Sequence, residues 1–533
     1  MVQYFLISFI FGYKKNIDFE QHSNKVSLLH SSLLFIQKIF KKENDFCFTM
    51  RSEESPEMEE KTGFFILIKR LWPHFLIYNS FAFTLATIFI NIVIISGMMW
   101  PGDTFADHAG ELGILTGTAA FMVALSGILF GVLADKVSRA KLMGIVELIF
   151  GFGLFFNGFV PEGQGGTTFT LFLTFALVRG FAIGGIWPLI SSHVNDSTED
   201  KERSQFFGAM QATFQLFNII GMLVSAFSFQ NNYWRQFYFI IGIVATFFGI
   251  IILMKAREPK RGATREELKN VLSSDEVVYQ YQLTKETIKS TIIAPTNLIA
   301  FFEGIFTTIL LAVPDFLFIA YLESPPYNLS PLVAAVFMII FGLPGGVIGS
   351  LAFAKISDRL GKKNIKYRIY MIVISITVLS FLYLILFNIP LPAMSVSEGN
   401  NFLFIISIPS FGVMGLLAFI ARSTTGLWNI NQPPVLQKIN LPEAQGKISS
   451  ANQFLESIGQ GMGPIIAGIL LVTYGQNYQI TILITTILGM IGGLFWLLAS
   501  IWINKDINRI SSILKEREIE LSTKSNSNNI DNR

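Results

Sequence analysis

The sequence is poor in the side chains that carry most protein chemistry. It has a single cysteine, Cys47, and five histidines, and charged residues make up only 14% of its 533 positions. One cysteine excludes an internal disulfide and a cysteine metal site, and the scattered histidines give no pair at metal-ligand spacing. The phosphate-binding pattern GxxxxGKS or GxxxxGKT does not occur. We therefore expect no metal, no cofactor and no use of ATP as an energy source.

Apolar side chains are abundant instead. Hydrophobic residues make up 51% of the chain, and the mean hydropathy is +0.52, which is typical of a membrane protein rather than a soluble one. The net charge of +3 is too small to indicate a nucleic-acid partner. The partners we expect are the lipid bilayer and a solute, with the protein acting as a monomer.

Twelve apolar runs have about the length that crosses a membrane. They predict an all-α polytopic membrane protein with twelve transmembrane helices in two pseudo-symmetric six-helix bundles. The runs are 75–98, 113–134, 142–160, 169–190, 206–229, 237–254, 297–321, 333–353, 367–387, 404–430, 448–473 and 480–502.

Positive charge alternates along the loops between these runs. Lysines and arginines fill the loops after even-numbered runs and the loop joining the halves, whereas the intervening loops have almost none. Because such bases stay on the cytoplasmic side, we expect both termini in the cytoplasm, in a protein of the cell membrane.

The remaining segments suggest a domain order. We predict an N-terminal extension at 1–62, bundles at 63–255 and 296–503, a linker with a short surface helix at 256–295, and a tail at 504–533 that is a brief helix followed by disorder. The composition of the residues before Met50 differs from that of the rest of the chain. Either translation starts at Met50, or the extension is an interfacial amphipathic segment.

A short charged sequence occurs once in each half. GVLADKVSRAK (131–141) and AKISDRLGKK (354–363) each follow an apolar run in a basic loop. The order Gly131, Asp135, Lys136, Arg139 resembles the signature between the second and third spans of the major facilitator superfamily. Ser138 replaces its second glycine, and in the other copy Ala354 replaces the first. The resemblance extends from about residue 64 to 502 and implies two bundles that move against each other.

In that family the signature acts as a latch, in which the aspartate caps a neighbouring helix and contacts bases. The resemblance places this conformational latch on Gly131, Asp135, Lys136 and Arg139, and on Asp358, Arg359, Gly361 and Lys362. Carboxylates do favour helix N-termini, and ion pairs can break when bundles rock. The alternative is that the bases only set membrane orientation.

Charged and amide side chains within the spans are the candidates for function, because a charge in the membrane is costly unless it faces protein or water. They can line a path for substrate or a coupling proton, or simply pair to hold helices together. Glu147 is a further acid that belongs either to the path or to the loop charges. The candidate path residues are Arg179, Glu303, Arg422, Asn452 and Glu456.

Glycines four residues apart predict close helix packing, and prolines within spans predict bends. The glycine pairs are Gly180 with Gly184, Gly342 with Gly346, and Gly345 with Gly349; the prolines are Pro188, Pro314, Pro344 and Pro464.

A narrower resemblance involves REPKRGATREE, which begins at Arg257 after the sixth run. It looks like the spinster-like branch of the superfamily, whose members carry lysolipids or sphingolipids. That branch has a glutamate about two turns after its fourth-span arginine, whereas this chain has Ile186 and Trp187 there. The glycine four after the arginine is replaced by Ile183.

These observations predict a secondary transporter, not an enzyme, that moves a small organic solute by alternating access. A spinster-like transporter of lysolipids or another amphiphile is the first alternative. A membrane sensor or assembly protein on the same scaffold is the second. Substrate, direction and coupling ion are not specified by the sequence.

Overall fold

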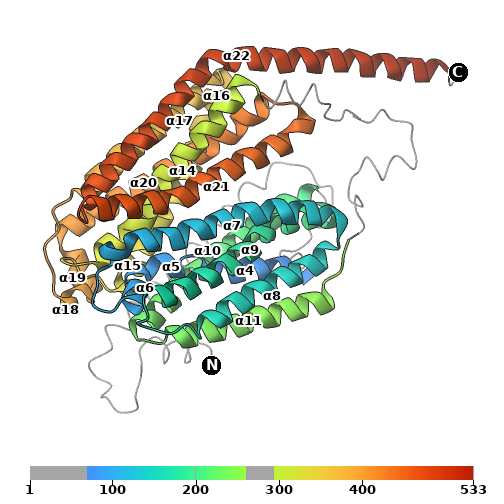
Figure 1. Ribbon diagram of the computed structural model, residues 1–533. Helices are drawn as coiled ribbons and strands as arrows, with labels where there is room; N and C mark the ends of the chain where they lie inside the picture. The colour runs from blue at the N-terminus through green and yellow to red at the C-terminus, as the bar shows by residue number, and fades with distance from the viewer. Residues whose placement is uncertain (1–68, 199, 260–292, 532–533) are drawn as a thin grey trace, which may run out of the picture. The chain divides into compact units, whose positions relative to one another are not determined.

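The computed structural model describes residues 69–198, 200–259 and 293–531, all within one compact unit, Gly63–Arg533. In these residues every regular element is a helix (Figure 1). Twelve stretches are long and apolar enough to cross a membrane, which confirms the predicted fold class. The proposed start at Met50 and the predicted linker helix lie outside the described residues.

The N-terminal half contains spans one to six. Its first span is interrupted twice, at Ala86 and at Asn91, where the φ angle is −119°, and so consists of three helices. The elements are α4 (Trp72–Leu85), α5 (Thr87–Ile90), α6 (Ile92–Met99), η1 (Phe105–His108), α7 (Ala109–Lys136), α8 (Arg139–Asn157), α9 (Gly166–Ser197), α10 (Asp200–Gln230) and α11 (Trp234–Lys255).

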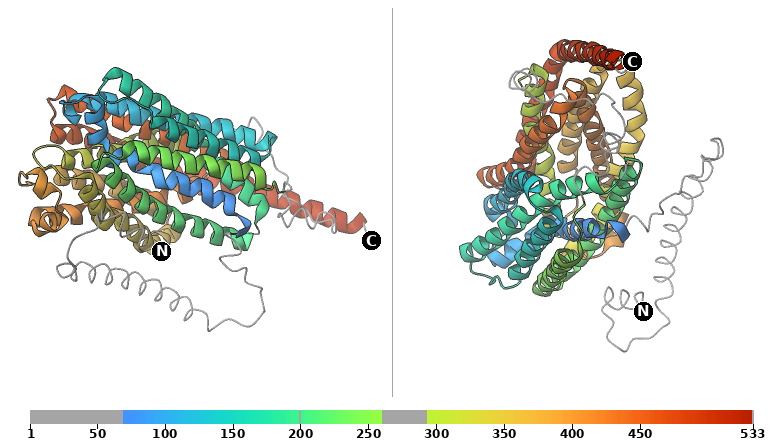
Figure 2. Two further views of the ribbon diagram at one scale, coloured as in Figure 1. Left: turned by 90° about the horizontal axis from the view of Figure 1, so that it is seen from below. Right: turned by 90° about the vertical axis from the view of Figure 1, so that its right-hand side faces the viewer.

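The C-terminal half contains spans seven to twelve, and its eighth span holds a π-helical turn. The elements are α14 (Pro295–Glu323), α15 (Pro331–Phe337), the π-helix η2 (Met338–Gly342), α16 (Leu343–Lys363), α17 (Lys366–Phe387), α18 (Val396–Gly399), α19 (Phe402–Ser407), α20 (Pro409–Lys438), α21 (Pro442–Thr473) and α22 (Tyr478–Asp531). Seen along the helices in the right-hand view of Figure 2, the blue-to-green and yellow-to-red helices form two groups.

Two sequence predictions about helix ends were wrong. The tenth span starts at Pro409 rather than at residue 404, because α19 ends at Ser407 and Ile408 has extended backbone. The tail after the twelfth span is not a brief helix, since α22 continues to Asp531.

We call the end of the bundles that carries the loops 136–141 and 355–368 the basic end, and the other the base-poor end. At the base-poor end the two halves touch through polar side chains. Gln476 Nε2 donates to Asp107 Oδ1 at 2.6 Å, and Gln230 Nε2 donates to Asn400 Oδ1 at 2.9 Å. Gln230 Oε1 also accepts from the Leu332 N–H at 3.3 Å.

Glycines let α7 and α21 approach closely near the same end, and Figure 1 shows the two helices side by side. A Cβ added at Gly113 would lie 2.3 Å from the Pro464 carbonyl oxygen, at Gly117 2.2 Å from that of Gly461, and at Gly468 2.0 Å from that of Ala109. Only glycine permits this backbone contact between the halves.

The predicted glycine pairs divide into two kinds. Gly180 and Gly184 pack against α7, and Gly345 and Gly349 pack against α20, each with an added Cβ within 2.7 Å of a neighbouring atom. A Cβ added at Gly346, by contrast, would have no neighbouring atom within 4 Å. The packing prediction is therefore confirmed for Gly180 with Gly184 and for Gly345 with Gly349. It is wrong for Gly342 with Gly346, because a Cβ at Gly342 would meet only Met338 of the same span.

At the basic end the last helix of the C-terminal half folds against its own bundle. Asp506 of α22 is 2% exposed and accepts from the Thr296 N–H at 3.2 Å and the Thr296 hydroxyl at 2.6 Å. Because Thr296 lies in the first turn of α14, this carboxylate caps that helix. Ile510 of α22 packs nearby on Phe301 and Ile448.

Candidate functional site

The most prominent charged contact within the spans joins Arg422 of α20 to Asp315 of α14. Two guanidinium nitrogens reach the two carboxylate oxygens, and the NH1 to Oδ2 distance is 3.5 Å. The side chains are 33% and 40% exposed, respectively. The pair is thus neither sealed in the protein nor fully solvated, so a ligand can reach either charge.

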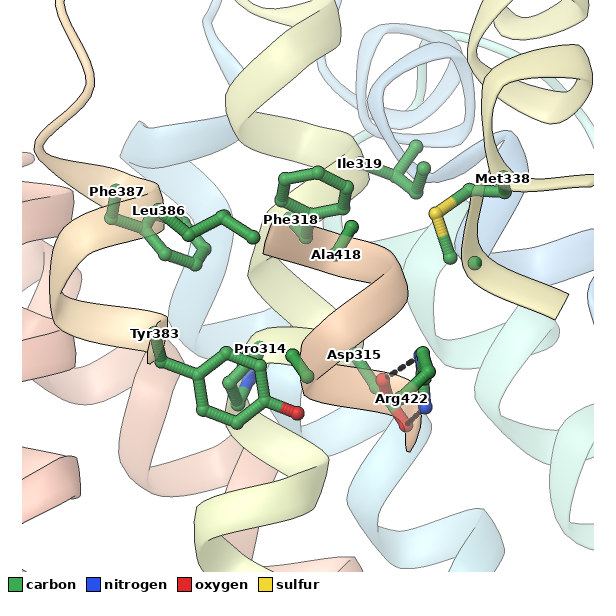
Figure 3. Close-up of a pocket in the computed structure, with 12 residues that line it drawn as sticks. Pro314, Asp315, Phe318, Ile319, Met338, Tyr383, Leu386, Phe387, Ala418 and Arg422 are labelled. Atoms are coloured by element: carbon green, nitrogen blue, oxygen red, sulfur yellow. Dashed lines mark hydrogen bonds and ion pairs between the residues drawn. The ribbon is translucent and has the colours of Figure 1, made fainter. Parts of the chain in front are cut away.

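A pocket adjoins this pair inside the C-terminal half. It offers about 40 Å³ to a water-sized group, enough for a few water molecules but too small to enclose an organic solute. Figure 3 shows Asp315 and Arg422 facing each other at one end and Phe318, Leu386 and Phe387 at the other. The remaining lining residues are Pro314, Ile319, Met338, Gly342, Tyr383, Ala418 and Ala421.

The position of the pair follows from local structure. Pro314 is inside α14 and removes a backbone donor next to Asp315. On the opposite wall, Met338 and Gly342 belong to the π-turn η2, a feature that often occurs at functional sites. The sequence pattern singled out Arg422 but not Asp315, although Asp315 met the same criterion of a charge inside an apolar run.

Glu303 and Glu456 lie in a second polar cluster of the C-terminal half. Glu303 of α14 is fully buried; one of its carboxylate oxygens accepts from the Thr307 hydroxyl, and Oε2 has no hydrogen-bond partner. Glu456 Oε1 on α21 accepts amide N–H groups from Gln432 at 2.8 Å and Asn452 at 2.6 Å. Among the ion pairs of the described residues, neither carboxylate has a cation, so both depend on neutral hydrogen-bond donors.

Arg179 makes its contacts within the N-terminal half. Its guanidinium carbon lies 5.8 Å from the centre of the Tyr238 ring on α11. Its Cγ would be 2.8 Å from a Cβ added at Gly153 on α8. Arg179 is therefore directed between α8 and α11, and its predicted equivalence with Arg422 is not seen in these contacts.

Glu147 of α8 is fully buried, and both carboxylate oxygens lack a hydrogen-bond partner of good geometry. It lies in the N-terminal bundle near Ser80 of α4 rather than among the loop charges. Glu147 is therefore not one of the loop charges, and its place in a solute path stays a prediction.

The first latch loop is fastened by a residue that the sequence did not single out. Glu258, just after α11, accepts from Arg139 Nε at 2.7 Å, from the Ala140 N–H at 2.8 Å and from the Ser138 hydroxyl at 3.0 Å. Arg139 NH1 also donates to the Ser192 carbonyl oxygen on α9 at 2.8 Å. One carboxylate thus caps α8 and holds α8, α9 and the start of the linker together.

These contacts also set the acidity of Glu258. Partial burial alone would raise its pKa, but the hydrogen bonds from Ala140, Arg139 and Ser138 outweigh this and lower the pKa below the ordinary value. Of the other predicted residues in this loop, Lys136 is exposed, and a Cβ added at Gly131 would have no neighbouring atom within 4 Å. The side chain of Asp135 lies outside the described part.

In the second latch loop Asp358 has a different base from those expected. Arg368 of α17, not Arg359 or Lys362, donates to Asp358 Oδ1 at 2.7 Å. Arg368 also reaches Asn431 Oδ1 of α20 at 3.3 Å. Gly361 is explained by this contact, because a Cβ there would lie 2.5 Å from Arg368 Nε.

Comparison with known proteins places this geometry in a family context. Residues 76–429 match the family described as Major Facilitator Superfamily. A "Probable sugar efflux transporter" of Helicobacter pylori (strain ATCC 700392 / 26695) is 22% identical over 445 residues, which cover 82% of this chain and 97% of that protein. A "Putative niacin/nicotinamide transporter NiaP" of Bacillus subtilis is 22% identical over 171 residues, covering 32% and 41% of the two chains.

Solved structures have the same fold. The structure of a bacterial homolog to the human lysosomal transporter Spinster, inward-facing and unoccupied, has a TM-score of 0.64 at 16% identity and covers 83% of this chain and 98% of that chain. The nucleoside transporter NupG has a TM-score of 0.56 at 14% identity, with coverage of 81% and 98%.

Proposed function

Because the chain belongs to the major facilitator superfamily, whose members are transporters rather than enzymes, we propose that it is a secondary transporter that carries a small organic solute by alternating access. The observation that carries the proposal is the Asp315–Arg422 pair, because charges inside spanning helices are costly unless they face protein or water, and this pair is partly exposed beside a pocket. The adjoining pocket is small, and so it supplies one wall of a larger site completed by the other half.

The contacts between halves suggest which way that site opens. Asp107 with Gln476 and Gln230 with Asn400 join the halves at the base-poor end. If the basic end faces the cytoplasm, this conformation is open inward. The ion pairs Arg139–Glu258 and Asp358–Arg368 then belong to the latch, fixing each loop to its own bundle while the halves are apart.

Glu303 and Glu456 are the groups that we assign to a coupling proton. A buried carboxyl without a cation can exchange a proton when water reaches it, and Asn452 holds Glu456 in position. Protonation removes the charge that would otherwise oppose movement of the halves. Arg179 stays a candidate that acts within the N-terminal half.

Two solute classes are worth comparing directly. A sugar is suggested by the curated relatives, whereas an amphiphile such as a lysolipid is favoured by the apolar lining of the pocket from Phe318 to Phe387. Both put a polar group on the Asp315–Arg422 pair.

Counterflow in proteoliposomes tests the proposal, with labelled sugars, nucleosides and lysolipids offered separately to the purified chain. We expect uptake of one class and its loss in Arg422→Gln. Arg235→Gln is the matched control, because Arg235 pairs with Glu162 at 3.3 Å outside the pocket. Binding without flux in any of these assays would instead favour a membrane sensor.

A further inference from the structure

A groove runs along α9 on the surface of the N-terminal half. Helix α9 packs against α7 on one side and against α8 on the other (Figure 1), so α9 forms the floor of the groove and its two neighbours form the walls. The groove has a volume of about 350 Å³, which is in the range of sites that hold a small organic ligand. No step of the proposed transport uses it. The lining residues are Met122 of α7, Ile149 of α8, and Thr174, Leu177, Val178 and Phe181 of α9.

The groove lies on the outer side of α9. Trp187 follows Val178 by nine residues, which is half a circle around a helix. The Trp187 ring lies 6.4 Å from the ring of Tyr78 on α4, so this side of α9 faces α4. The groove, on the opposite side, therefore faces away from α4.

The walls of the groove continue into exposed apolar surface. Leu125 lies one turn beyond Met122 on α7 and is 57% exposed, and Phe152 lies one turn beyond Ile149 on α8 and is 49% exposed. Large exposed apolar side chains on spanning helices face lipid. The groove is thus open to the bilayer.

The groove is also deep in the membrane. Met122, Ile149 and Val178 each lie within three residues of the midpoint of their span. Because the hydrocarbon core is about 30 Å thick, the groove is about 15 Å from the headgroups on either side. The spans concerned are Phe105–Ala134, Arg139–Asn157 and Gly166–Val194.

The chemistry of the lining favours a purely apolar ligand. Thr174 is the one polar residue of the six, and its hydroxyl donates to the carbonyl oxygen one turn earlier at 2.8 Å, so it has no hydrogen left for a ligand. An aromatic pair stands at each end of the lining stretch of α9. Phe181 packs on Phe130 of α7 with ring centres 5.2 Å apart, and Phe175 packs on Phe156 of α8 at 6.0 Å.

We propose that this groove binds the terminal part of the acyl chain of a bilayer phospholipid. Headgroups stay at the membrane surface, so the part of a lipid that reaches this depth is the end of a long chain. Lipid tails are as apolar as the lining, and the attraction therefore comes from close packing against the walls. A bound chain contacts α7, α8 and α9 at once and stabilises the N-terminal half.

Photolabelling in nanodiscs tests the position of the chain. One phosphatidylcholine probe has a diazirine at the end of an acyl chain, and the other has it next to the ester. We expect the first probe, but not the second, to label the peptides that contain the lining residues. Thr174→Trp should fill the groove and remove this labelling, and the exposure of Thr174 lets the larger side chain enter without repacking the interior.

Ile240→Trp is the matched control, because this residue of α11 is 59% exposed outside the groove, and it should leave the labelling unchanged. Equal labelling by the two probes, or labelling retained in Thr174→Trp, overturns the site. If the solute found by counterflow displaces the probe, the groove belongs to the transport path, and the assignment to a bilayer lipid is wrong.

The effect on stability is measured separately by thermal unfolding of delipidated protein in detergent. Added dioleoyl phosphatidylcholine should raise the unfolding temperature of the wild type until the site is saturated, and it should raise that of Thr174→Trp less. Dioctanoyl phosphatidylcholine, whose chains are short, should have a smaller effect on the wild type. The same increase in wild type and Thr174→Trp would contradict the proposal. Neither readout measures flux, so a failure here is distinct from a failure of the transport assays.

Discussion

Arg422 and Asp315 show how a single charge constrains its partner. Removing either charge leaves the other unpaired in a partly exposed site, which costs roughly 1 to 3 kcal/mol, between the values for exposed and buried pairs. We expect Arg422→Gln and Asp315→Asn each to abolish uptake of the solute identified by counterflow. The double variant should recover thermal stability but not transport, as measured by thermal unfolding and proteoliposome flux. Recovery of flux in the double variant would mean that the pair is only structural.

Glu258 gives a prediction about pH. Its folded pKa is lowered, so its contribution to stability is present above the pKa of the unfolded chain and is lost as pH falls through the lowered value. We expect Glu258→Gln to destabilise the protein by about 1 kcal/mol at neutral pH, as for a lost helix cap. The unfolding temperatures of the wild type and of Glu258→Gln should converge at acid pH. If the difference in stability stayed constant across pH, the effect would come from the shape of the side chain and not from its charge.

The sequence revealed charged residues but not their partners. Arg422 and Glu303 were conspicuous because they interrupt apolar runs. Asp358, however, was expected to pair within its own loop, and it pairs with Arg368 of the next helix. Glu258 was one of many charges in the linker. Which residues meet depends on how each helix is rotated about its axis, and a single sequence does not contain that angle.

Helix α7 makes its closest approach to α21 through glycine, and this contact can be tested by adding one methyl group. We expect Gly117→Ala to push the Gly461 carbonyl away, since its Cβ would lie 2.2 Å from that oxygen, at an overpacking cost of about 1 to 3 kcal/mol. Labelling of introduced cysteines should then increase at the base-poor end. Gly110→Ala on the same helix is the control, because a Cβ added there would have no neighbouring atom within 4 Å. Equal labelling of both variants would argue against a role for this contact in closure.

The elements themselves were largely predictable, because twelve runs of hydrophobic length leave few alternatives. Hydropathy does not reveal changes in helix geometry that leave a run apolar. Neither the π-turn at Met338–Gly342 nor the break at Ile408 alters the apolar character of its run. The length of α22 was missed because its last part is polar, and hydropathy does not distinguish a polar helix from a polar coil.

Movement of the halves as a whole requires that the base-poor contacts separate. A flexible cross-linker between Asp107→Cys and Gln476→Cys, in a Cys47→Ser background, should therefore stop transport, because their side chains hydrogen-bond across the halves. Cleaving the cross-linker should restore transport. Cross-linking Asp103→Cys to Glu111→Cys, both in the N-terminal half, is the control. Undiminished flux in the cross-linked protein would contradict a rocking motion.

The cap that Asp506 places on α14 has a practical consequence for anyone who shortens this protein. A chain cut after residue 503 keeps all twelve apolar runs of the sequence, yet it removes the acceptor of the Thr296 N–H in the first turn of α14 and uncovers Phe301 and Ile448. Such a deletion would resemble a harmless trimming of a polar tail. In detergent, the C-terminal half of the chain cut after residue 503 should be less stable. A cut after residue 520 should leave its stability unchanged.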